Sequence, residues 1–257
     1  SHQILIVGGG TAGITVASQL MRADQNLDIA IIEPSEQHYY QPAWTLVGGG
    51  VYQIENSVKP QKACIPDRVT WIQAAVETFE PDQSYVITKK GQKISYDYLI
   101  VCPGIQIDWH LVKGLPEALG KDGVTSNYSR NCAPYTWELI RNFKGGNAIF
   151  TYPATPIKCG GAPQKIMYLA DEAFRQRGVR QQTHITYGVA TPKLFQVPAY
   201  SDSLEKVVER KNIDVKFQHN LIEIKPDTKE AIFAAQTSQG VEELTLKYDM
   251  IHVAPPM

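Results

Sequence analysis

The chain has 257 residues, 43% of them hydrophobic and 20% charged, which is typical of a globular protein with one large domain or two of modest size. Its 25 Lys and Arg residues balance 26 Asp and Glu residues. The resulting net charge of −1 argues against a nucleic-acid-binding protein, which needs an excess of basic charge. No apolar run approaches the roughly 18 residues of a membrane-spanning helix, so we expect this chain to be soluble by itself.

The N-terminal residues predict a dinucleotide-binding unit. An apolar strand over residues 4–7 leads into Gly8-Gly9-Gly10-Thr11-Ala12-Gly13, and apolar residues at helical spacing follow. A second strand, over residues 28–32, ends at Glu33. This is the pattern G-x-G-x-x-G between a strand and a helix, with an acidic residue 20 positions after the last glycine.

Each residue type in this pattern has a physical role. Gly8 permits the tight turn, Gly10 lets the backbone approach a pyrophosphate, and Gly13 lets the helix pack closely on the strand. The free N–H groups of the helix N-terminus favour phosphates. Glu33 is suited to accept hydrogen bonds from ribose hydroxyls, and its charge disfavours a 2′-phosphate.

The following hundred residues contain several short strands separated by turn residues. We expect strands at 69–73, 76–79 and 84–88, a strand ending at residue 94 or 95, and a buried strand at 98–101 that ends at Cys102-Pro103-Gly104. This arrangement resembles the flavoprotein reductases that bind two dinucleotides, whose N-terminal site holds FAD. In those proteins the strand is followed by Ala-Thr-Gly rather than Cys-Pro-Gly.

Strands and helices then alternate, as in a second nucleotide-binding fold. The expected helices span residues 133–143, 163–177 and 200–211, and the expected strands span 147–152, 184–187, 215–217, 221–224, 230–234 and 243–246. We therefore predict an α/β protein with two Rossmann-like domains. The expected boundaries are 1–110 for the FAD-binding domain, 111–247 for a second domain, and 248–257 for the start of a return to the first domain, which is discontinuous and incomplete here.

The second domain lacks a glycine fingerprint where a nicotinamide nucleotide would bind. Residues 153–163 read PATPIKCGGAP, with Pro153 and Pro156 in place of turn glycines. Because proline removes an N–H donor and fixes φ, the usual phosphate cradle cannot form. We expect the fold to be retained and its NAD(P)H site to be lost.

A cysteine stands in this segment instead. Lys158 and the N-terminus of the following helix both favour the thiolate form of Cys159. Gly160 and Gly161 leave the sulfur uncrowded. A redox role is therefore indicated, and the alternative is a buried cysteine that acts as a small hydrophobic residue.

Several segments resemble the sulfide:quinone oxidoreductases, and the closest likeness is to the branch that includes the mitochondrial enzymes. The resemblance extends along essentially the whole chain, and the last motif is the most specific. The segments are HYYQPAWTLVG at 38–48, TSNYS at 125–129, GNAIFT at 146–151 and TPIKCGGAPQKIMYL at 155–169.

This resemblance implies FAD as the cofactor and sulfide, a sulfur acceptor and a membrane quinone as partners. It also implies that Cys159 is one of two redox cysteines, where hydrosulfide attacks a disulfide or trisulfide, a persulfide forms, and two electrons pass through the flavin to the quinone. By family position, the expected cofactor contacts are Gly8, Gly10, Thr11, Ala12 and Gly13 at the pyrophosphate, Glu33 at the ribose, Gln41 along the cofactor, Val76 at the adenine through its backbone, and Gly104 near the flavin.

The other cysteines and a neighbouring lysine leave alternatives open. None of Cys64, Cys102 and Cys132 matches the second redox cysteine of the family, which belongs to the C-terminal part, although a Cys132–Cys159 bridge is conceivable. No cluster has the spacing of metal ligands. Lys165 is expected to be a solvated helix residue, with an electrostatic effect on Cys159 as the alternative.

Other functions remain open at this point. The chain is compatible with a flavocytochrome c sulfide dehydrogenase subunit, with a type II NADH dehydrogenase, or with a non-catalytic nucleotide-binding fragment. Since the resemblance places the second cysteine, the quinone pocket and the membrane contacts further along the chain, we expect this chain alone to bind FAD weakly and to be inactive. Location on the cytoplasmic or matrix side of a membrane is implied by resemblance alone.

Overall fold

A computed structural model describes residues 1–257. The chain divides into two compact units: unit 1 contains Ser1–Tyr40 and Glu55–Ile105, and unit 2 contains Gln41–Ile54 and Gln106–Met257. The predicted α/β class is confirmed, because each unit is built on parallel strands joined through helices. No helix has both the length and the apolar composition needed to cross a membrane.

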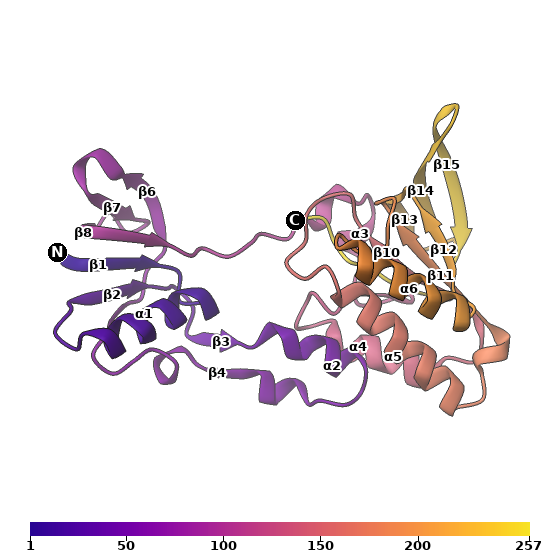
Figure 1. The fold of residues 1–257 in the computed structure, drawn as a ribbon, viewed down its shortest axis with the longest axis horizontal. Coiled ribbons are helices and arrows are strands. Elements are labelled where there is room, and N and C mark those ends of the chain that lie inside the picture. Colours follow the sequence, from indigo (N-terminus) through magenta and orange to yellow (C-terminus); the bar gives the residue numbers. More distant parts are fainter. The chain divides into compact units, whose positions relative to one another are not determined.

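Unit 1 is built on a six-stranded sheet in the order β5-β2-β1-β8-β7-β6, of which β5, β2, β1 and β8 run parallel (Figure 1). A separate antiparallel pair, β3 and β4, connects to unit 2. The elements are β1 (His2–Val7), α1 (Thr11–Ala23), β2 (Ile29–Ile32), β3 (Gln37–Tyr39), β4 (Val58–Pro60), β5 (Thr70–Ile72), β6 (Val76–Glu80), β7 (Tyr85–Thr88) and β8 (Lys93–Val101).

The two strands expected around residues 94 and 98–101 are one continuous strand, β8. Its first residues pair with β7, as Ser95 does with Tyr85, and its later residues pair with β1, as Leu99 does with Leu5. Each half therefore reads as a separate strand in the sequence because each half has a different neighbour.

The core of unit 1 lies on both faces of β1. Ile4 and Ile6 face one hydrophobic cluster, which α1 covers with Ala17 and Met21, whereas Leu5 and Val7 face the other. This alternation is what a strand buried on both faces requires. Burial of both faces fixes the position of β1, and therefore of the glycine-rich turn that follows its last residue.

Unit 2 is built on a parallel five-stranded sheet in the order β12-β11-β10-β16-β9, with a three-stranded antiparallel sheet, β13-β14-β15. The strands are β9 (Val124–Thr125), β10 (Gly146–Tyr152), β11 (Thr183–Val189), β12 (Asp214–Phe217), β13 (His219–Lys225), β14 (Glu230–Thr237), β15 (Gly240–Lys247) and β16 (Met250–His252). The helices are α2 (Trp44–Gly48), α3 (Leu115–Ala118), α4 (Ala133–Asn142), α5 (Ala162–Gln176) and α6 (Pro198–Arg210).

The last strand, β16, lies between β10 and β9 in the sheet of unit 2. We expected residues 248–257 to begin a return to the first domain, but Ile251 pairs with Ile149 on one side and with Val124 on the other. All three residues of β16 are buried. The strand therefore joins the central strand β10 to the edge strand β9 of the second sheet.

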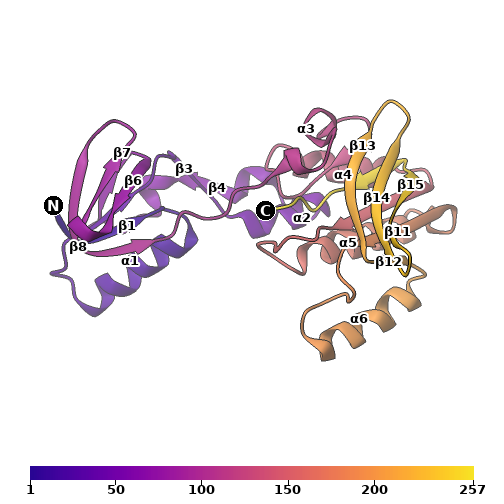
Figure 2. The ribbon, with the colours of Figure 1, turned by 90° about the horizontal axis from the view of Figure 1, so that it is seen from above.

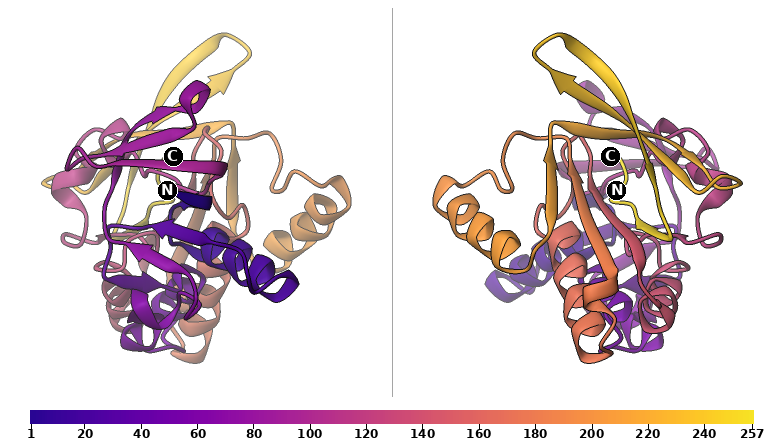
Figure 3. Two further views of the ribbon diagram at one scale, coloured as in Figure 1. Left: turned by 90° about the vertical axis from the view of Figure 1, so that its left-hand side faces the viewer. Right: turned by 90° about the vertical axis from the view of Figure 1, so that its right-hand side faces the viewer.

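The helices of unit 2 differ in how deeply they are packed. Helix α5 buries eight residues, among them Ile166, Met167 and Phe174, whereas α6 buries only Ser201 and Val208. Figures 2 and 3 show α6 standing apart from the strands, and Figure 3 also shows the β14–β15 hairpin projecting from the rest of this unit. The start of α6 is accordingly exposed to solvent.

A buried carboxylate joins the carboxyl ends of α5 and α6. Asp171 is fully buried, and its carboxylate binds Arg180 Nε at 2.6 Å, Lys211 Nζ at 2.6 Å and Arg175 Nε at 2.9 Å. Burial by itself raises the pKa of Asp171, but the hydrogen bonds from the three cations outweigh it and the pKa is lowered. Arg180 also donates to the backbone carbonyls of Thr183, Lys211 and Asn212.

We predict that Asp171→Asn destabilises unit 2 by about 3–5 kcal/mol, because removing one partner of a buried ion pair leaves the other charges uncompensated. Urea denaturation followed by tryptophan fluorescence measures this loss, since Trp44, Trp109 and Trp137 all lie in unit 2. Glu172→Gln is the matched control on the exposed face of the same helix, and a similar loss in both variants would contradict the prediction.

A second buried polar contact fixes the end of β16. His252 is fully buried, and its Nε2 lies 2.9 Å from the backbone N–H of Asn127, which donates to it. Burial lowers the pKa of His252 to about 3. Nε2 also lies 2.9 Å from Oδ1 of the same asparagine. The ring is neutral in the folded chain at pH 7 because burial disfavours the charged imidazolium.

We predict that His252 makes unit 2 less stable in acid. The unfolded histidine takes up its proton near pH 6.5 and the folded one only near pH 3, so the unfolded state binds more protons between these values and stability falls as the pH decreases. In His252→Gln, the pH dependence of the unfolding free energy between pH 6 and 4.5 should become shallower by about 1.4 kcal/mol per pH unit. An unchanged slope, or an equal change in the exposed control His110→Gln, would rule this out.

Candidate functional site

In the glycine-rich turn of unit 1, backbone atoms pack so closely against two of the glycines that a side chain at either position would clash. Gly8 has a φ of +102°, and a Cβ there would lie 2.0 Å from the carbonyl oxygen of Cys102. A Cβ on Gly13 would lie 1.9 Å from the carbonyl oxygen of Gly8. A Cβ on Gly10, in contrast, would meet nothing within 4 Å. The outer two glycines thus close the turn, and Gly10 faces open space at the N-terminus of α1.

A carboxylate and an amide hold this turn from the side. Glu33 Oε2 accepts the N–H of Gly9 at 2.8 Å, and Oε1 accepts the N–H of Ser35 at 2.8 Å. The buried Gln61 donates its Nε2 to the carbonyl of Gly9 at 2.7 Å. Sequence reasoning missed Gln61, because nothing in its neighbourhood shows that it reaches a loop 52 residues away.

The other predicted cofactor residues are distributed over the two units. Thr11 and Ala12 form the exposed first turn of α1, directly after Gly10. Val76 begins β6 opposite Thr88, and Gly104, with a φ of +79°, follows β8 in unit 1. Gln41 belongs to unit 2, where its Oε1 accepts a hydrogen bond from Lys158 Nζ at 2.5 Å.

The corresponding turn of unit 2 follows β10 and reaches α5 through residues 153–161. It carries Cys159, which is exposed, and its thiol is free like those of the other three cysteines. The phenol of Tyr128 donates to the Cys159 carbonyl at 3.2 Å, and the N–H of Lys158 donates to Met257 Sδ at 3.4 Å. These two contacts hold the backbone on either side of the sulfur.

Two tyrosines near Cys159 stay protonated. Burial, followed by the charge of Cys159, raises the pKa of Tyr128 far above its usual range, and the same two causes raise the pKa of Tyr152. Both phenols therefore stay neutral and add no negative charge near the sulfur.

The lysine beside the sulfur is not the one that the sequence suggested. Lys158 points toward Gln41 and lies 5.9 Å from the ring centre of Trp44 and 5.7 Å from that of Tyr128; burial lowers its pKa. Lys165, which we expected to be simply solvated, is exposed but places its Nζ 3.8 Å from Cys159 Sγ. One helical turn of α5 brings it back over the cysteine.

The remaining cysteines lie in other environments. Cys132 is buried at the start of α4, so its free thiol does not form the bridge to Cys159 that we considered conceivable. Cys102 is half-buried next to the Gly8 turn, and Cys64 is half-buried after the short 3-10 helix at Gln61–Ala63. Cys159 is the exposed thiol of the four.

A glycine-lined turn between a strand and a helix, with an acidic residue at the end of the next strand, defines a Rossmann-type dinucleotide-binding protein. Residues 2–138 match the family described as pyridine nucleotide-disulphide oxidoreductase, and the chain belongs to this family.

The sequence is also similar to named relatives. It is 50% identical over 257 residues to the mitochondrial sulfide:quinone oxidoreductase of Dictyostelium discoideum, covering 99% of this chain and 56% of that protein. It is 43% identical to the mitochondrial enzyme of Mus musculus, covering 100% of this chain and 57% of that protein. The resemblance seen in the motifs is confirmed, and the chain spans somewhat more than half the length of these relatives.

Solved structures confirm the fold. The sulfide:quinone oxidoreductase of Aquifex aeolicus matches with a TM-score of 0.82 at 22% identity, covering 100% of this chain and 59% of that one. NDH2 of Plasmodium falciparum, solved with NADH, matches with a TM-score of 0.69 at 14% identity, covering 98% of this chain and 54% of that one. At these identities the likeness establishes the architecture alone.

We predict that Lys165→Met slows alkylation of Cys159 by iodoacetamide at pH 7 by about five-fold, because it removes the ammonium that lies 3.8 Å from the sulfur and attracts negative charge there. Peptide mass spectrometry separates Cys159 from the other three thiols. Lys158→Met is the comparison, since its ammonium faces Gln41 and the aromatic rings. If Lys158→Met slows the reaction more than Lys165→Met, the assignment of Lys165 is wrong.

Proposed function

We propose that this chain forms part of an enzyme that oxidises sulfide and passes the electrons through FAD to a quinone. The observation that carries the proposal is the free, exposed Cys159 beside Lys165, within a chain 50% identical to a sulfide:quinone oxidoreductase. The prolines of the same turn argue against a nicotinamide nucleotide as the electron donor.

The residues of unit 1 fit FAD. The open space before Gly10 and the exposed first turn of α1 suit a pyrophosphate, and Glu33 retains lone pairs for a ribose hydroxyl in addition to its two backbone partners. Gly8, Thr11, Ala12 and Gly13 complete this cradle, and Val76, Gln41 and Gly104 are proposed contacts further along the cofactor. FAD supplies a two-electron acceptor that can in turn reduce a quinone.

Cys159 is proposed to carry the sulfur. Hydrosulfide attacks a disulfide between Cys159 and a second cysteine outside this sequence; an S–S bond forms to give the Cys159 persulfide, and the second cysteine leaves as a thiolate. A sulfur acceptor takes the outer sulfur and leaves Cys159 as a thiolate. Re-formation of the disulfide from the two thiolates then releases two electrons, which FAD would accept. Lys165 stabilises the negative charge that develops near Cys159, and Tyr128 fixes the backbone that carries it.

We further propose that unit 1 is completed by residues outside this sequence. After residue 96, β8 pairs with β1 on one edge only, and its side chains Tyr98 and Val101 are 66% and 52% exposed. A strand that belongs in the middle of a parallel sheet normally has neighbours on both edges. On this proposal the chain alone holds FAD weakly and does not reduce quinone, and attachment to a membrane, in mitochondria as for the relatives, depends on the remaining part.

The test uses the longer protein that contains this chain, purified with its flavin. We predict that Cys159→Ala lowers sulfide-dependent quinone reduction at least about 100-fold while the flavin absorbance stays stoichiometric, because the nucleophilic relay is lost. Cys64→Ser, at a half-buried thiol of unit 1, should retain activity.

Two results would overturn the proposal. The first is a Cys159→Ala enzyme that still reduces quinone with sulfide at the normal rate. The second is a flavin that NADH bleaches and sulfide does not, which would identify an NADH dehydrogenase instead.

A further inference from the structure

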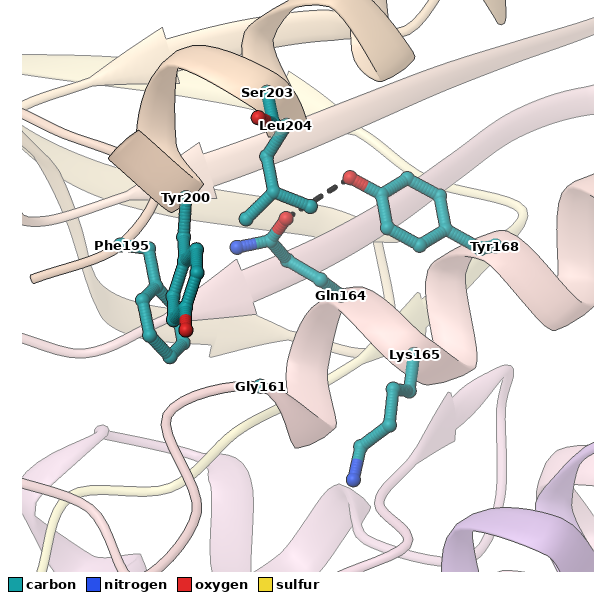
Figure 4. A pocket seen from close by; sticks show the side chains of 8 residues that line it. All are labelled: Gly161, Gln164, Lys165, Tyr168, Phe195, Tyr200, Ser203 and Leu204. Carbon is teal, nitrogen blue, oxygen red and sulfur yellow. Dashed lines mark hydrogen bonds between the residues drawn. The ribbon is translucent and has the colours of Figure 1, made fainter. Parts of the chain in front are cut away.

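A cavity of about 370 Å³ lies within unit 2 between the first turns of α5 and α6. Its lining consists of Gly161, Gln164, Lys165, Tyr168, Phe195, Tyr200, Ser203 and Leu204 (Figure 4). A volume of this size is sufficient for one small ligand. The cavity lies beyond the carboxyl ends of β10 and β11, where open parallel sheets bind their ligands.

The inside of the cavity is apolar because its polar groups already have partners. Gln164 is 3% exposed, its Nε2 donates to the carbonyl of Leu194 at 2.7 Å, and its Oε1 accepts from the hydroxyl of Tyr168 at 2.9 Å. Figure 4 shows Gln164 between Tyr168 on one side and the rings of Phe195 and Tyr200 on the other. A ligand there gains contact with rings and methyl groups, because the Gln164 amide and the Tyr168 hydroxyl already hydrogen-bond to protein groups.

Two aromatic rings form one wall. The ring centres of Phe195 and Tyr200 are 6.0 Å apart with an angle of 55° between the planes, and Tyr200 is 61% exposed. This leaves the mouth of the cavity accessible and suits an aromatic ring inserted edge-on or stacked. Because α6 buries only two residues, the wall also has freedom to adjust.

One charge stands at the rim. Lys165 lines the cavity, and in Figure 4 its side chain extends away from the aromatic wall. Its Nζ reaches Cys159 Sγ at 3.8 Å, so the same ammonium belongs both to the rim of the cavity and to the surroundings of the thiol.

We propose that this cavity binds a small amphipathic molecule with an aromatic or compact apolar body and a single anionic end. The body occupies the space between Gln164 and the Phe195–Tyr200 wall, and the anionic end pairs with Lys165. The pairing draws the ammonium away from Cys159, so the site controls how reactive that thiol is. The inference does not depend on the proposed flavin chemistry, since every residue involved lies in unit 2.

The test uses two fluorescent probes with nearly the same aromatic body. 1-Anilinonaphthalene-8-sulfonate carries the anionic group, and the uncharged N-phenyl-1-naphthylamine lacks it. Both should bind the purified chain with a stoichiometry of one. Ser203→Trp, which fills the cavity from the exposed side of α6, should abolish binding of both, whereas Asp202→Trp, on the same helix outside the lining, should leave binding unchanged.

The charge is tested separately. Lys165→Gln should lower the binding affinity for the sulfonate probe by about two- to five-fold, as expected for an exposed ion pair. It should leave the affinity for the neutral probe unchanged. Lys206→Gln, an exposed lysine of α6 outside the lining, is the control. In the unmodified chain the sulfonate probe should slow alkylation of Cys159 more than the neutral probe does.

Three outcomes would overturn the proposal. They are unchanged probe binding in Ser203→Trp, equal effects of Lys165→Gln on the two probes, and NADH displacing both probes stoichiometrically. The last result would mean that the cavity is still a nicotinamide-nucleotide site despite the prolines.

Discussion

The structure of unit 1 depends on a backbone approach that only glycine allows. The carbonyl oxygen of Gly8 occupies the space that a Cβ on Gly13 would take, and the carbonyl oxygen of Cys102 does the same for Gly8. These contacts bring the ends of β1 and β8 and the start of α1 together at one place. Glu33 and Gln61 then hold the turn through the backbone of Gly9, and the remaining free surface is the open space at Gly10.

Unit 2 has the same strand–turn–helix connection, but its turn contains prolines where the turn of unit 1 contains glycines. Pro153 and Pro156 remove N–H donors from the turn after β10, so the backbone has fewer groups to offer a phosphate. The chain instead presents a side chain, Cys159, and anchors the turn through Tyr128 and Met257. The same architecture thus presents backbone donors in one unit and a thiol in the other, which is why function has to be argued from each turn and not from the fold.

The parts of the fold that the sequence predicted are those governed by local pattern. The glycine fingerprint, the alternation of strands and helices, and the position of Cys159 before α5 all depend on residues close together in the chain. The features that it missed depend on distant partners. Gln61 reaches Gly9 across 52 residues, Asp171 meets Lys211 across 40, and β8 reads as two strands because its neighbour changes partway along.

The two lysines near Cys159 show the same limit most directly. Lys158 is adjacent in sequence, yet its ammonium is held by Gln41 and lies near the rings of Trp44 and Tyr128, in surroundings whose burial lowers its pKa. Gln41 begins the segment Gln41–Ile54, and a second hydrogen bond, from Asn127 to Thr45, ties the same segment into unit 2. Lys158 therefore acts as a structural anchor for an inserted segment. Lys165 lies six residues after Cys159 on the exposed side of α5, and its ammonium contacts the sulfur at 3.8 Å. The lysine that is adjacent in sequence is thus engaged elsewhere, and the lysine one helical turn into α5 is the one beside the thiol.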